Sequence, residues 1–210
     1  MTIGIYSDVD FPQPSVWHVG VAKIKKLLAG VSHAVITRAD INDEKYSLSR
    51  FDCIIFPGGY AYPGYTEHIS QIGKQRLRTY VESGGKYIGI CAGAYFAGQN
   101  IIYSGEDVTQ VGNYDLCLYS GTIRGPAYKS HYDLRWKSTK IIFENDVIRM
   151  KYAAAPYFDE CGTVIARYLD NTPAIVSEKC GDGEVLLFGP HPELNSDSRT
   201  KRLFLEMLAK

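Results

Sequence analysis

The stretch "YIGICAGAYF", residues 87–96, joins an apolar strand-like run to the start of a helix through one cysteine. Gly89 and Gly93 stand two places before and after Cys91. A strand that turns into a helix at one residue strains that residue and needs small neighbours, because strand and helix approach closely. The spacing therefore predicts an elbow that raises the Cys91 thiol clear of a sheet, where the positive end of the helix stabilises a thiolate. The alternative is a small buried cysteine that closes a strand.

The motif "GPHPE", residues 189–193, offers partners for such a thiol, directly after the apolar run "GEVLLF". A thiol nucleophile needs a base, and the base needs an acceptor that orients it. His191 can be the base and Glu193 the acceptor, because side chains two apart in an extended stretch point to the same side. Taken alone, His191 would be a histidine in a surface loop.

The glycines of "PGG", residues 57–59, end another strand-like run. Gly58 and Gly59 carry backbone N–H groups that no side chain obstructs. One of them, with the N–H of Ala92, predicts an oxyanion hole for a tetrahedral intermediate. A plain glycine turn is the alternative.

Strand-like and helix-like runs alternate around these motifs in the first half of the chain. This alternation, with nearly continuous apolar strands, predicts an α/β fold whose mostly parallel sheet is covered by helices on both faces. Ligands bind at the carboxyl edge of such sheets, so the three motifs should converge there. We expect strands at 2–6, 33–39, 51–59 and 86–90, and helices at 14–28 (beginning at Pro14 or Ser15), 66–85 (capped by Thr66) and from Ala92 onward.

The second half of the chain carries strand-like runs joined by Gly, Asp and Asn turns. They predict antiparallel strands added to the parallel sheet or packed beside it. These runs are 115–128, 139–152, 162–169, 173–180 and 183–189, and a last helix is expected over 196–210 with Ser196 or Asp197 as its cap. Because no linker or repeat interrupts the pattern, we expect one domain over residues 1–210.

Composition excludes several classes of function. The 23 Lys and Arg balance the 23 Asp and Glu, so neither nucleic acid nor an anionic membrane is an expected partner. No apolar run reaches the roughly 20 residues of a membrane span, and no signal peptide is evident, so a cytoplasmic protein is expected. The five cysteines are scattered without a CxxC pair, which argues against a disulfide framework and a metal site. The 16 tyrosines could line a pocket or an interface, which leaves a homodimer open.

The three motifs, in this order, resemble the class I glutamine amidotransferase-like superfamily. The resemblance implies a Rossmann-like or flavodoxin-like sheet and a Cys-His-Glu triad made of Cys91, His191 and Glu193. Glutaminases of this kind carry Gln four residues after the nucleophile, where it helps to hold the substrate. This chain has Tyr95 there, which argues against glutamine as the substrate.

A closer resemblance links "GICAGAYFAG", "LYSGTIRGPAY", "YAAAPYF" and "GEVLLFGPHPE" to the N-terminal domain of biotin-protein ligases and its stand-alone bacterial relatives. It runs from the first strand to the last helix. It does not imply biotin ligation, because that chemistry belongs to a separate C-terminal domain, which we do not expect within these 210 residues.

Further side chains are candidates for the pocket. Arg124 can clamp a substrate carboxylate, or form a surface salt bridge instead. Tyr60, with Tyr62 and Tyr65, can cover the site, and Tyr95 can contact the substrate. Tyr157 and Phe158 are expected in the core, and His131 is a rival base.

Two functions remain open at this point, together with a weaker third. In the first, Cys91 attacks a small amide, ester or thioester, so the protein is a hydrolase or acyl transferase without a cofactor. In the second, the chain is a binding or regulatory module that kept the elbow and lost catalysis. In the third, Cys91 acts in redox chemistry, with no second cysteine nearby in the sequence to resolve a sulfenic acid.

Overall fold

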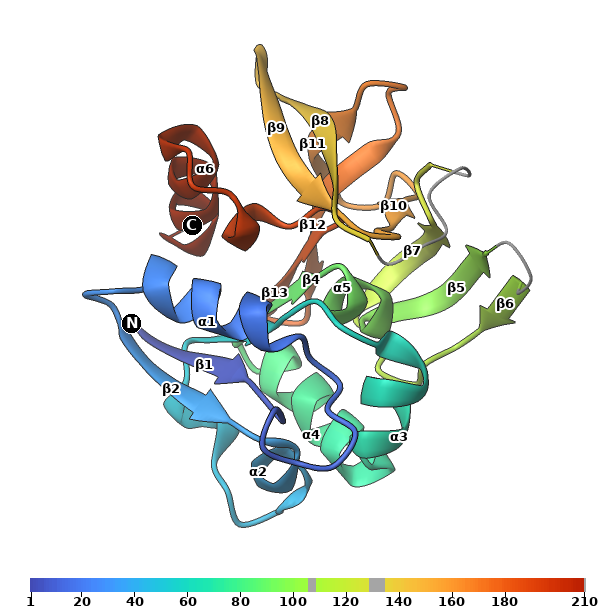
Figure 1. Ribbon diagram of the computed structural model, residues 1–210. Coiled ribbons are helices and arrows are strands. Elements are labelled where there is room, and N and C mark those ends of the chain that lie inside the picture. Colours follow the sequence, from blue (N-terminus) through green and yellow to red (C-terminus); the bar gives the residue numbers. More distant parts are fainter. Residues whose placement is uncertain (106–108, 129–134, 210) are drawn as a thin grey trace.

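The protein was analysed as a computed structural model, which describes residues 1–105, 109–128 and 135–209 (Figure 1). The rival base His131 lies outside the described residues. The larger of two sheets has nine strands within these ranges, in the order β2-β1-β3-β4-β13-β12-β11-β8-β9. Its parallel part consists of β1 (Thr2–Tyr6), β2 (Ser32–Ile36), β3 (Cys53–Phe56), β4 (Lys86–Ile90) and β13 (Gly183–Phe188).

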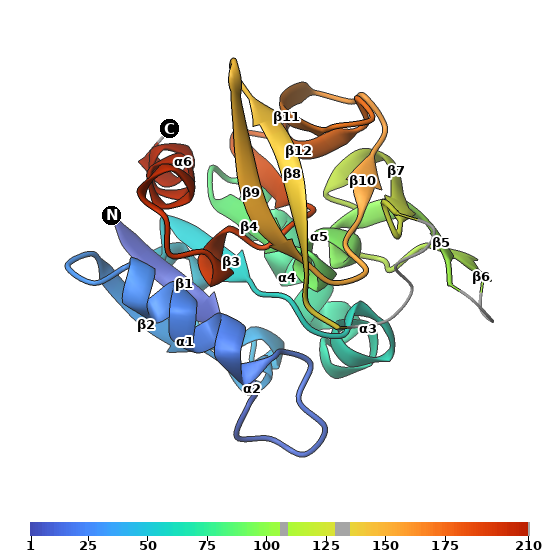
Figure 2. The same ribbon diagram turned by 45° about the horizontal axis from the view of Figure 1, so that its top comes forward.

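Helices cover both faces of the parallel part. The helix α1 (His18–Leu27) connects β1 to β2, and α4 (Gln71–Glu82) connects β3 to β4. The two connections run in opposite directions across the sheet, so right-handed crossovers place these helices on opposite faces (Figures 1 and 2). The predicted α/β class is thus confirmed.

The antiparallel strands of the second half take both predicted positions. Strands β12 (Pro173–Cys180), β11 (Thr163–Tyr168), β8 (Lys137–Phe143) and β9 (Asp146–Tyr152) extend the main sheet beyond β13. A separate four-stranded sheet, visible at the right of Figure 1, has the order β10-β7-β5-β6. Its strands are β5 (Gly98–Ser104), β6 (Thr109–Gly112), β7 (Tyr119–Gly125) and β10 (Tyr157–Phe158). This sheet is mixed rather than purely antiparallel as expected, because β5 pairs with β7 in parallel.

The first helix begins later than expected, at His18 instead of Pro14 or Ser15. The carboxylate of Asp8 accepts hydrogen bonds from Ser15 N at 2.9 Å and from Val16 N at 3.3 Å. These bonds hold the segment extended beside the "PGG" loop, because tertiary hydrogen bonds outweigh the local helix signal.

The expected helix over 66–85 is two helices, α3 (Thr66–His68) and α4. Thr66 is therefore not the cap of the long helix. Ser70 is, because its side chain accepts a hydrogen bond from Gly73 N at 3.1 Å. Asn42, at the end of the short helix α2 (Arg38–Asn42), also binds Ser70 N at 2.9 Å and fixes this break.

The helix α2 and the strands β5, β6 and β10 were not expected. The helix α5 (Ala92–Phe96) is followed at once by β5 and then β6, where no strand was predicted. α2 occupies the end of the expected second strand. The last helix, α6 (Ser198–Ala209), is preceded by Asp197, whose carboxylate accepts from Thr200 N at 2.9 Å. Within the described residues, no helix is long and apolar enough to cross a membrane.

A buried aromatic cluster lies beneath the carboxyl edge of the parallel strands. Phe56 stacks on Tyr6 and Tyr87 with ring centroids 4.8 Å and 5.1 Å apart. Tyr65 donates a hydrogen bond to Pro57 O at 2.7 Å, and Tyr87 donates to Gly93 O at 2.7 Å. These hydroxyls tie the loops at the strand ends to the core, so the site rests on a rigid base.

Candidate active site

Cys91 stands on the elbow that its flanking glycines predict. Its backbone has φ 50° and ψ −101°, immediately before the first residue of α5. A Cβ at Gly93 would overlap the carbonyl oxygen of Phe56, and a Cβ at Gly89 would approach the carbonyl of Gly93 too closely. Only glycine fits at both positions, because β3, β4 and α5 meet there backbone to backbone.

His191 and Glu193 follow β13 and form a buried pair. Nδ1 of His191 lies 2.8 Å from Oε1 of Glu193, and both side chains are at most 1% exposed. The N–H of His191 donates to Lys151 O at 2.9 Å, so the end of β9 fixes the backbone of the loop. The carboxylate thereby determines that Nε2 is the ring nitrogen left for chemistry.

The charge state of His191 follows from its neighbours. Burial by itself lowers the pKa of this imidazole, but the negative charge of Glu193, the nearby Cys91 sulfur and the hydrogen bond to Glu193 outweigh this effect. The net effect raises the pKa of His191 to about 10. The site is thus arranged to hold an imidazolium between two groups that can be negative.

The resting hydrogen bond of the thiol is made elsewhere. Sγ of Cys91 donates to Ala153 O at 3.6 Å. Nε2 of His191 is buried and has no partner of normal hydrogen-bond geometry among the described residues. In unliganded enzymes such catalytic contacts are often loose and tighten when substrate binds.

Both tryptophans of the chain cover His191. Trp17 stacks on its ring with centroids 5.8 Å apart and planes inclined by 26°, and Trp136 meets it edge-on at 4.9 Å. Neither tryptophan stands in a sequence motif, so neither was expected at the site. Their indoles shield the ring from water and provide faces that favour an imidazolium.

Three residues were proposed for the oxyanion hole, namely Gly58, Gly59 and Ala92, and the structure separates Gly58 from the other two. Gly59 and Ala92 line the cavity beside Cys91, and their N–H groups make no hydrogen bond within the described residues. Gly58 lies against the imidazole instead, where a Cβ would overlap His191 Cε1. Gly59 and Ala92 are therefore the two candidates that share the cavity wall with Cys91.

Asp8, at the end of β1, sets the position of this loop. Its carboxylate holds Ser15 and Val16, as described above. Ser15 O then accepts from Tyr60 N at 2.7 Å, and Trp17 N donates to Gly58 O at 3.1 Å. One buried carboxylate thus aligns both Trp17 and the Gly58–Gly59 backbone, and only the fold reveals this role.

A cavity of about 370 Å³ opens beside Cys91. None of the described residues that line it is Lys, Arg, Asp or Glu. Tyrosines dominate its wall, and Tyr60 is among them, as predicted. The lining residues are Trp17, Gly59, Tyr60, Ala61, Tyr62, Cys91, Ala92, Tyr95, Tyr103, Gln110, Tyr114, Ala153 and Ala154.

Tyr95 and the "AAA" run close one side of this cavity. The Tyr95 hydroxyl donates to Ala154 O at 3.1 Å, next to the carbonyl that accepts from the Cys91 thiol. Small side chains at Ala153 and Ala154 let these carbonyls approach the elbow. The repeated alanine was the signal available in the sequence, where we had considered only the aromatic residues that follow.

Two expected pocket residues lie elsewhere. Arg124 does not line the cavity, because its Nε pairs with Asp159 Oδ1 at 3.0 Å on the half-exposed side of β7. The structure thus shows the salt bridge that was the alternative, and the clamp stays a prediction. Tyr65 is fully buried in the core beneath the site. Its hydroxyl donates a hydrogen bond to Pro57 O in the loop after β3.

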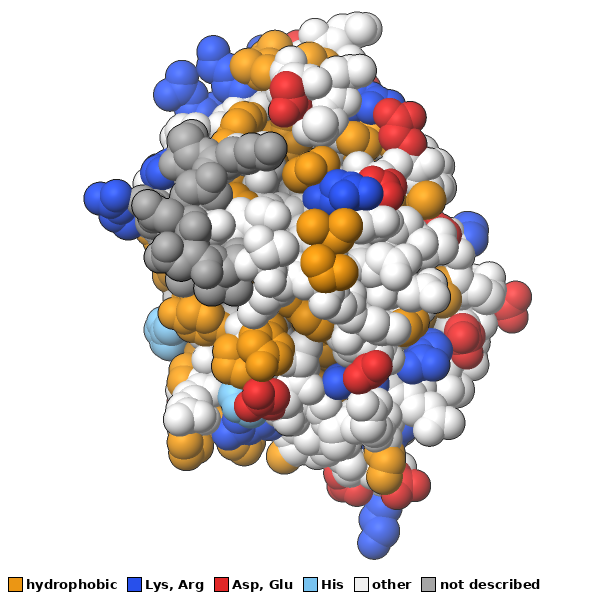
Figure 3. All heavy atoms as spheres, turned by 90° about the vertical axis from the view of Figure 1, so that its right-hand side faces the viewer, with side chains coloured by type: hydrophobic (Ala, Val, Ile, Leu, Met, Phe, Trp, Pro, Cys, Tyr) orange, Lys and Arg blue, Asp and Glu red, His pale blue; other side chains and the backbone are white. Residues whose placement is uncertain are grey.

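The surface around the site carries charges of both signs. Figure 3 shows blue and red side chains interspersed on the face of the second sheet, with separate apolar clusters between them. Within the described residues, no group of three or more His, Cys, Asp or Glu side chains is placed to hold a metal ion.

Comparison with known proteins gives a family match over most of the chain. The family model described as "Biotin-protein ligase, N terminal" matches residues 1–144. A biotin–protein ligase of Schizosaccharomyces pombe is 27% identical over 181 residues, which are 74% of this chain and 28% of the ligase. An uncharacterized protein of Chlamydia muridarum is 32% identical over 155 residues, 67% of this chain and 60% of that protein. The chain thus spans less than two thirds of either relative.

The fold recurs in a solved structure. A glutamine amidotransferase from Thermotoga maritima is 13% identical, has a TM-score of 0.57, and aligns with 100% of this chain and 82% of its own. At this identity the likeness concerns the fold alone. The family match, which covers more than half of the chain, shows that the chain belongs to the biotin-protein ligase N-terminal family.

Proposed function

We propose that the protein is a cysteine-nucleophile hydrolase or acyl transferase that acts on a small amide, ester or thioester. The observation that carries the proposal is the strained backbone of Cys91, with φ 50° at the mouth of α5, beside a cavity. Strain of this kind costs about 1–3 kcal/mol and persists at functional sites. Cys117 also has φ 50°, but Cys91 combines this backbone with a strand-to-helix turn and a place in the wall of a cavity, which Cys117 does not line.

The proposed reaction begins from the form in which Nε2 of His191 carries a proton and Cys91 is a thiolate. The thiolate attacks the substrate carbonyl, and the N–H groups of Gly59 and Ala92 stabilise the oxyanion. The imidazolium returns its proton to the leaving group as the carbonyl–heteroatom bond breaks, which leaves a thioester on Cys91. Water then attacks the thioester with His191 as base, and the acid and the free thiol are regenerated.

Glutamine is disfavoured as the substrate. Its α-ammonium and α-carboxylate would enter a cavity whose described lining holds no charged side chain. Burying unpaired charges costs several kcal/mol. Tyr95 also occupies the place of the glutaminase Gln and is engaged with Ala154 O.

We further propose that residues 1–210 act as one amidotransferase-like domain in the cytoplasm. All five cysteines are free, which suits a reducing compartment. The ligand is a small molecule rather than nucleic acid, in keeping with the balanced charge.

The resting contact of the thiol favours a second candidate, a binding module that retains the elbow without turnover. Cys91 bonds Ala153 O while two indoles cover His191. In that case a ligand would occupy the cavity and no acyl-enzyme would form.

Limiting iodoacetamide with peptide mapping separates the two. We expect Cys91 to be alkylated before the half-buried Cys117 and Cys161, although it is only 4% exposed, and His191→Gln to slow its alkylation. Cys91→Ala should abolish ester turnover. If Cys91 reacts no faster than the two reference cysteines, the enzyme proposal fails and the binding module stands.

A further inference from the structure

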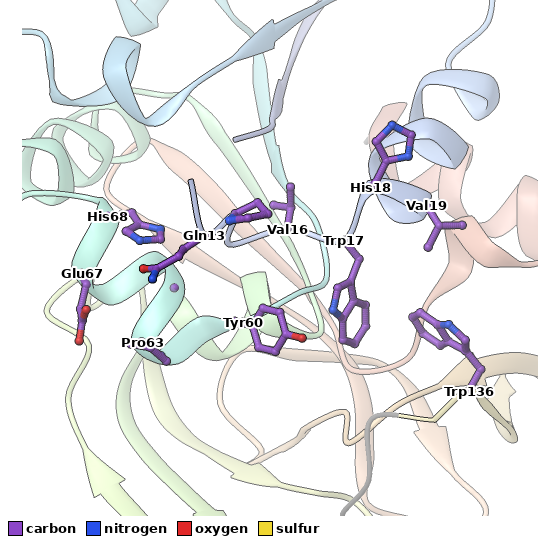
Figure 4. Close-up of a pocket in the computed structure, with 12 residues that line it drawn as sticks. Gln13, Val16, Trp17, His18, Val19, Tyr60, Pro63, Glu67, His68 and Trp136 are labelled. Atoms are coloured by element: carbon purple, nitrogen blue, oxygen red, sulfur yellow. The ribbon is translucent and has the colours of Figure 1, made fainter. Parts of the chain in front are cut away.

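A second, larger cavity adjoins the one that holds Cys91. It measures about 830 Å³ and shares Trp17 and Tyr60 with the smaller cavity. Figure 4 shows Trp17 and Trp136 on one side of it, with Tyr60, Glu67 and His68 on the other. Trp17 and Tyr60 thus form the boundary between the two cavities.

The position of His191 decides which cavity takes which part of a substrate. Its Nδ1 is bound by Glu193, so Nε2 must deliver the proton to the leaving group. Trp17 stacks on this ring, and Trp136 touches its edge. Both indoles line the larger cavity. His191 is not among the described lining residues of either cavity, so these two ring contacts are what place the leaving atom at the Trp17 side of Cys91, where the larger cavity begins.

We propose that the larger cavity binds the leaving group, a primary amine with an aromatic body that is neutral or cationic, and that the smaller cavity binds a neutral acyl group. The proposal rests on the proposed function and names its substrate class, an N-substituted amide. An enzyme that released only ammonia would need no cavity on this side.

The chemistry of the linings sets the two preferences. Trp17, Tyr60 and Trp136 offer aromatic faces for stacking to the leaving group. Glu67 is the only Lys, Arg, Asp or Glu side chain among the described residues of this lining. A cation therefore gains from both the carboxylate and the ring faces, while an anion is repelled.

The step is balanced without another reactant. The thiolate of Cys91 forms the C–S bond, the C–N bond breaks, and the proton on Nε2 goes to the amine nitrogen. By microscopic reversibility, an amine that fits the larger cavity should also attack the acyl-enzyme. The products are then an amide and the free thiol.

This reversal gives the test. The protein is acylated with 4-nitrophenyl butyrate, and four amines compete with water for the acyl-enzyme. They are ammonia, benzylamine, its 4-trimethylammoniomethyl derivative and its 4-carboxy derivative. Amide formation is measured by mass spectrometry and corrected for the reaction of each amine with the ester in buffer.

We expect benzylamine to intercept the acyl-enzyme about tenfold better than ammonia, the cationic derivative at least as well as benzylamine, and the carboxylate worse. Glu67→Gln should reduce the difference in interception between the cationic derivative and the carboxylate derivative. Glu206→Gln, on the exposed face of α6, serves as the matched control and should not change that difference.

The burst of 4-nitrophenol separates the two levels of the proposal. A burst that disappears in Cys91→Ala, combined with equal interception by ammonia and the benzylamines, overturns this inference and leaves the proposed function intact. The same holds if the carboxylate is preferred. Absence of any Cys91-dependent burst overturns both.

Discussion

The Cys91 thiol donates its hydrogen bond to Ala153 O, at 3.6 Å, while Nε2 of His191 has no partner within the described residues. Two residues earlier, Lys151 O accepts the N–H of His191 at 2.9 Å. The end of β9 therefore holds both members of the proposed pair. Attack requires Cys91 to lose its proton and its hydrogen bond to Ala153 O, and a bound substrate can induce this change.

The close packing at the elbow can be tested with one methyl group. Gly93→Ala places a Cβ on the carbonyl of Phe56, and backbone cannot move aside cheaply, so we expect a loss of about 2–4 kcal/mol in the free energy of unfolding. Gly112→Ala, in an open position, is the matched control and should change it by less than about 0.5 kcal/mol. Equal effects in urea denaturation would contradict the elbow geometry.

The strained backbone at Cys91 predicts that glycine is more stable than alanine at this position, the reverse of the order expected at an ordinary strand position. Because φ is 50° there, Cys91→Gly should be more stable than Cys91→Ala by about 1 kcal/mol, although both are inactive. At Cys53, in the buried strand β3, the alanine variant should be the more stable of the pair. Thermal unfolding of the four variants measures these stabilities. If alanine were the more stable substitution at both sites, Cys91 would be unstrained.

The raised pKa of His191 predicts how stability depends on pH. An unfolded chain titrates histidine near 6.5, roughly its reference pKa, whereas folded His191 titrates at about 10. The stabilisation is therefore fully present below pH 6.5 and is lost as pH rises through 10. In Glu193→Gln, the effect of burial should outweigh the remaining electrostatic attraction on His191, so the pKa of His191 should fall. The loss of folding stability between pH 7 and 10 should then be smaller than in the wild type.

Imidazole NMR titration and urea denaturation across this range provide the measurements. Glu206→Gln, a surface change, should retain the wild-type profile. An unaltered His191 titration in Glu193→Gln would refute the electrostatic account.

The role of Asp8 predicts an effect at a distance. Asp8→Asn replaces an acceptor oxygen of the buried carboxylate with a donor that faces Ser15 N and Val16 N, so we expect a loss of about 1–3 kcal/mol. Acylation of Cys91 by 4-nitrophenyl butyrate should slow as well, because Trp17 and Gly59 lose their alignment. Asp10→Asn, on an exposed residue of the same loop, should do neither. Wild-type acylation in a destabilised Asp8→Asn would limit Asp8 to a purely structural role.

Much of the site could be predicted because its signals are local. The elbow around Cys91 depends on residues within two positions, and the His191–Glu193 spacing on an extended stretch of three. Strand ends of a parallel sheet share one edge, so their convergence followed from the alternating pattern.

The boundaries that were wrong have long-range causes. Ser15 was expected in a helix, but Asp8 and the Gly58–Gly59 loop compete for its backbone. Arg124 was expected at the pocket, yet Asp159, which is 35 residues away in the chain, pairs with it. A pattern of neighbouring residues cannot predict these contacts, because the partners are distant in the sequence.

The sequence by itself determined the α/β architecture and the three strand-end motifs, because hydrophobic period and close glycine contacts act over a few residues. The tertiary structure alone decided what surrounds them: two indoles over His191, Ala153 as the resting acceptor of Cys91, and a cavity whose described lining residues include no Lys, Arg, Asp or Glu. These groups come from distant segments, and only the folded chain brings them within a few ångströms.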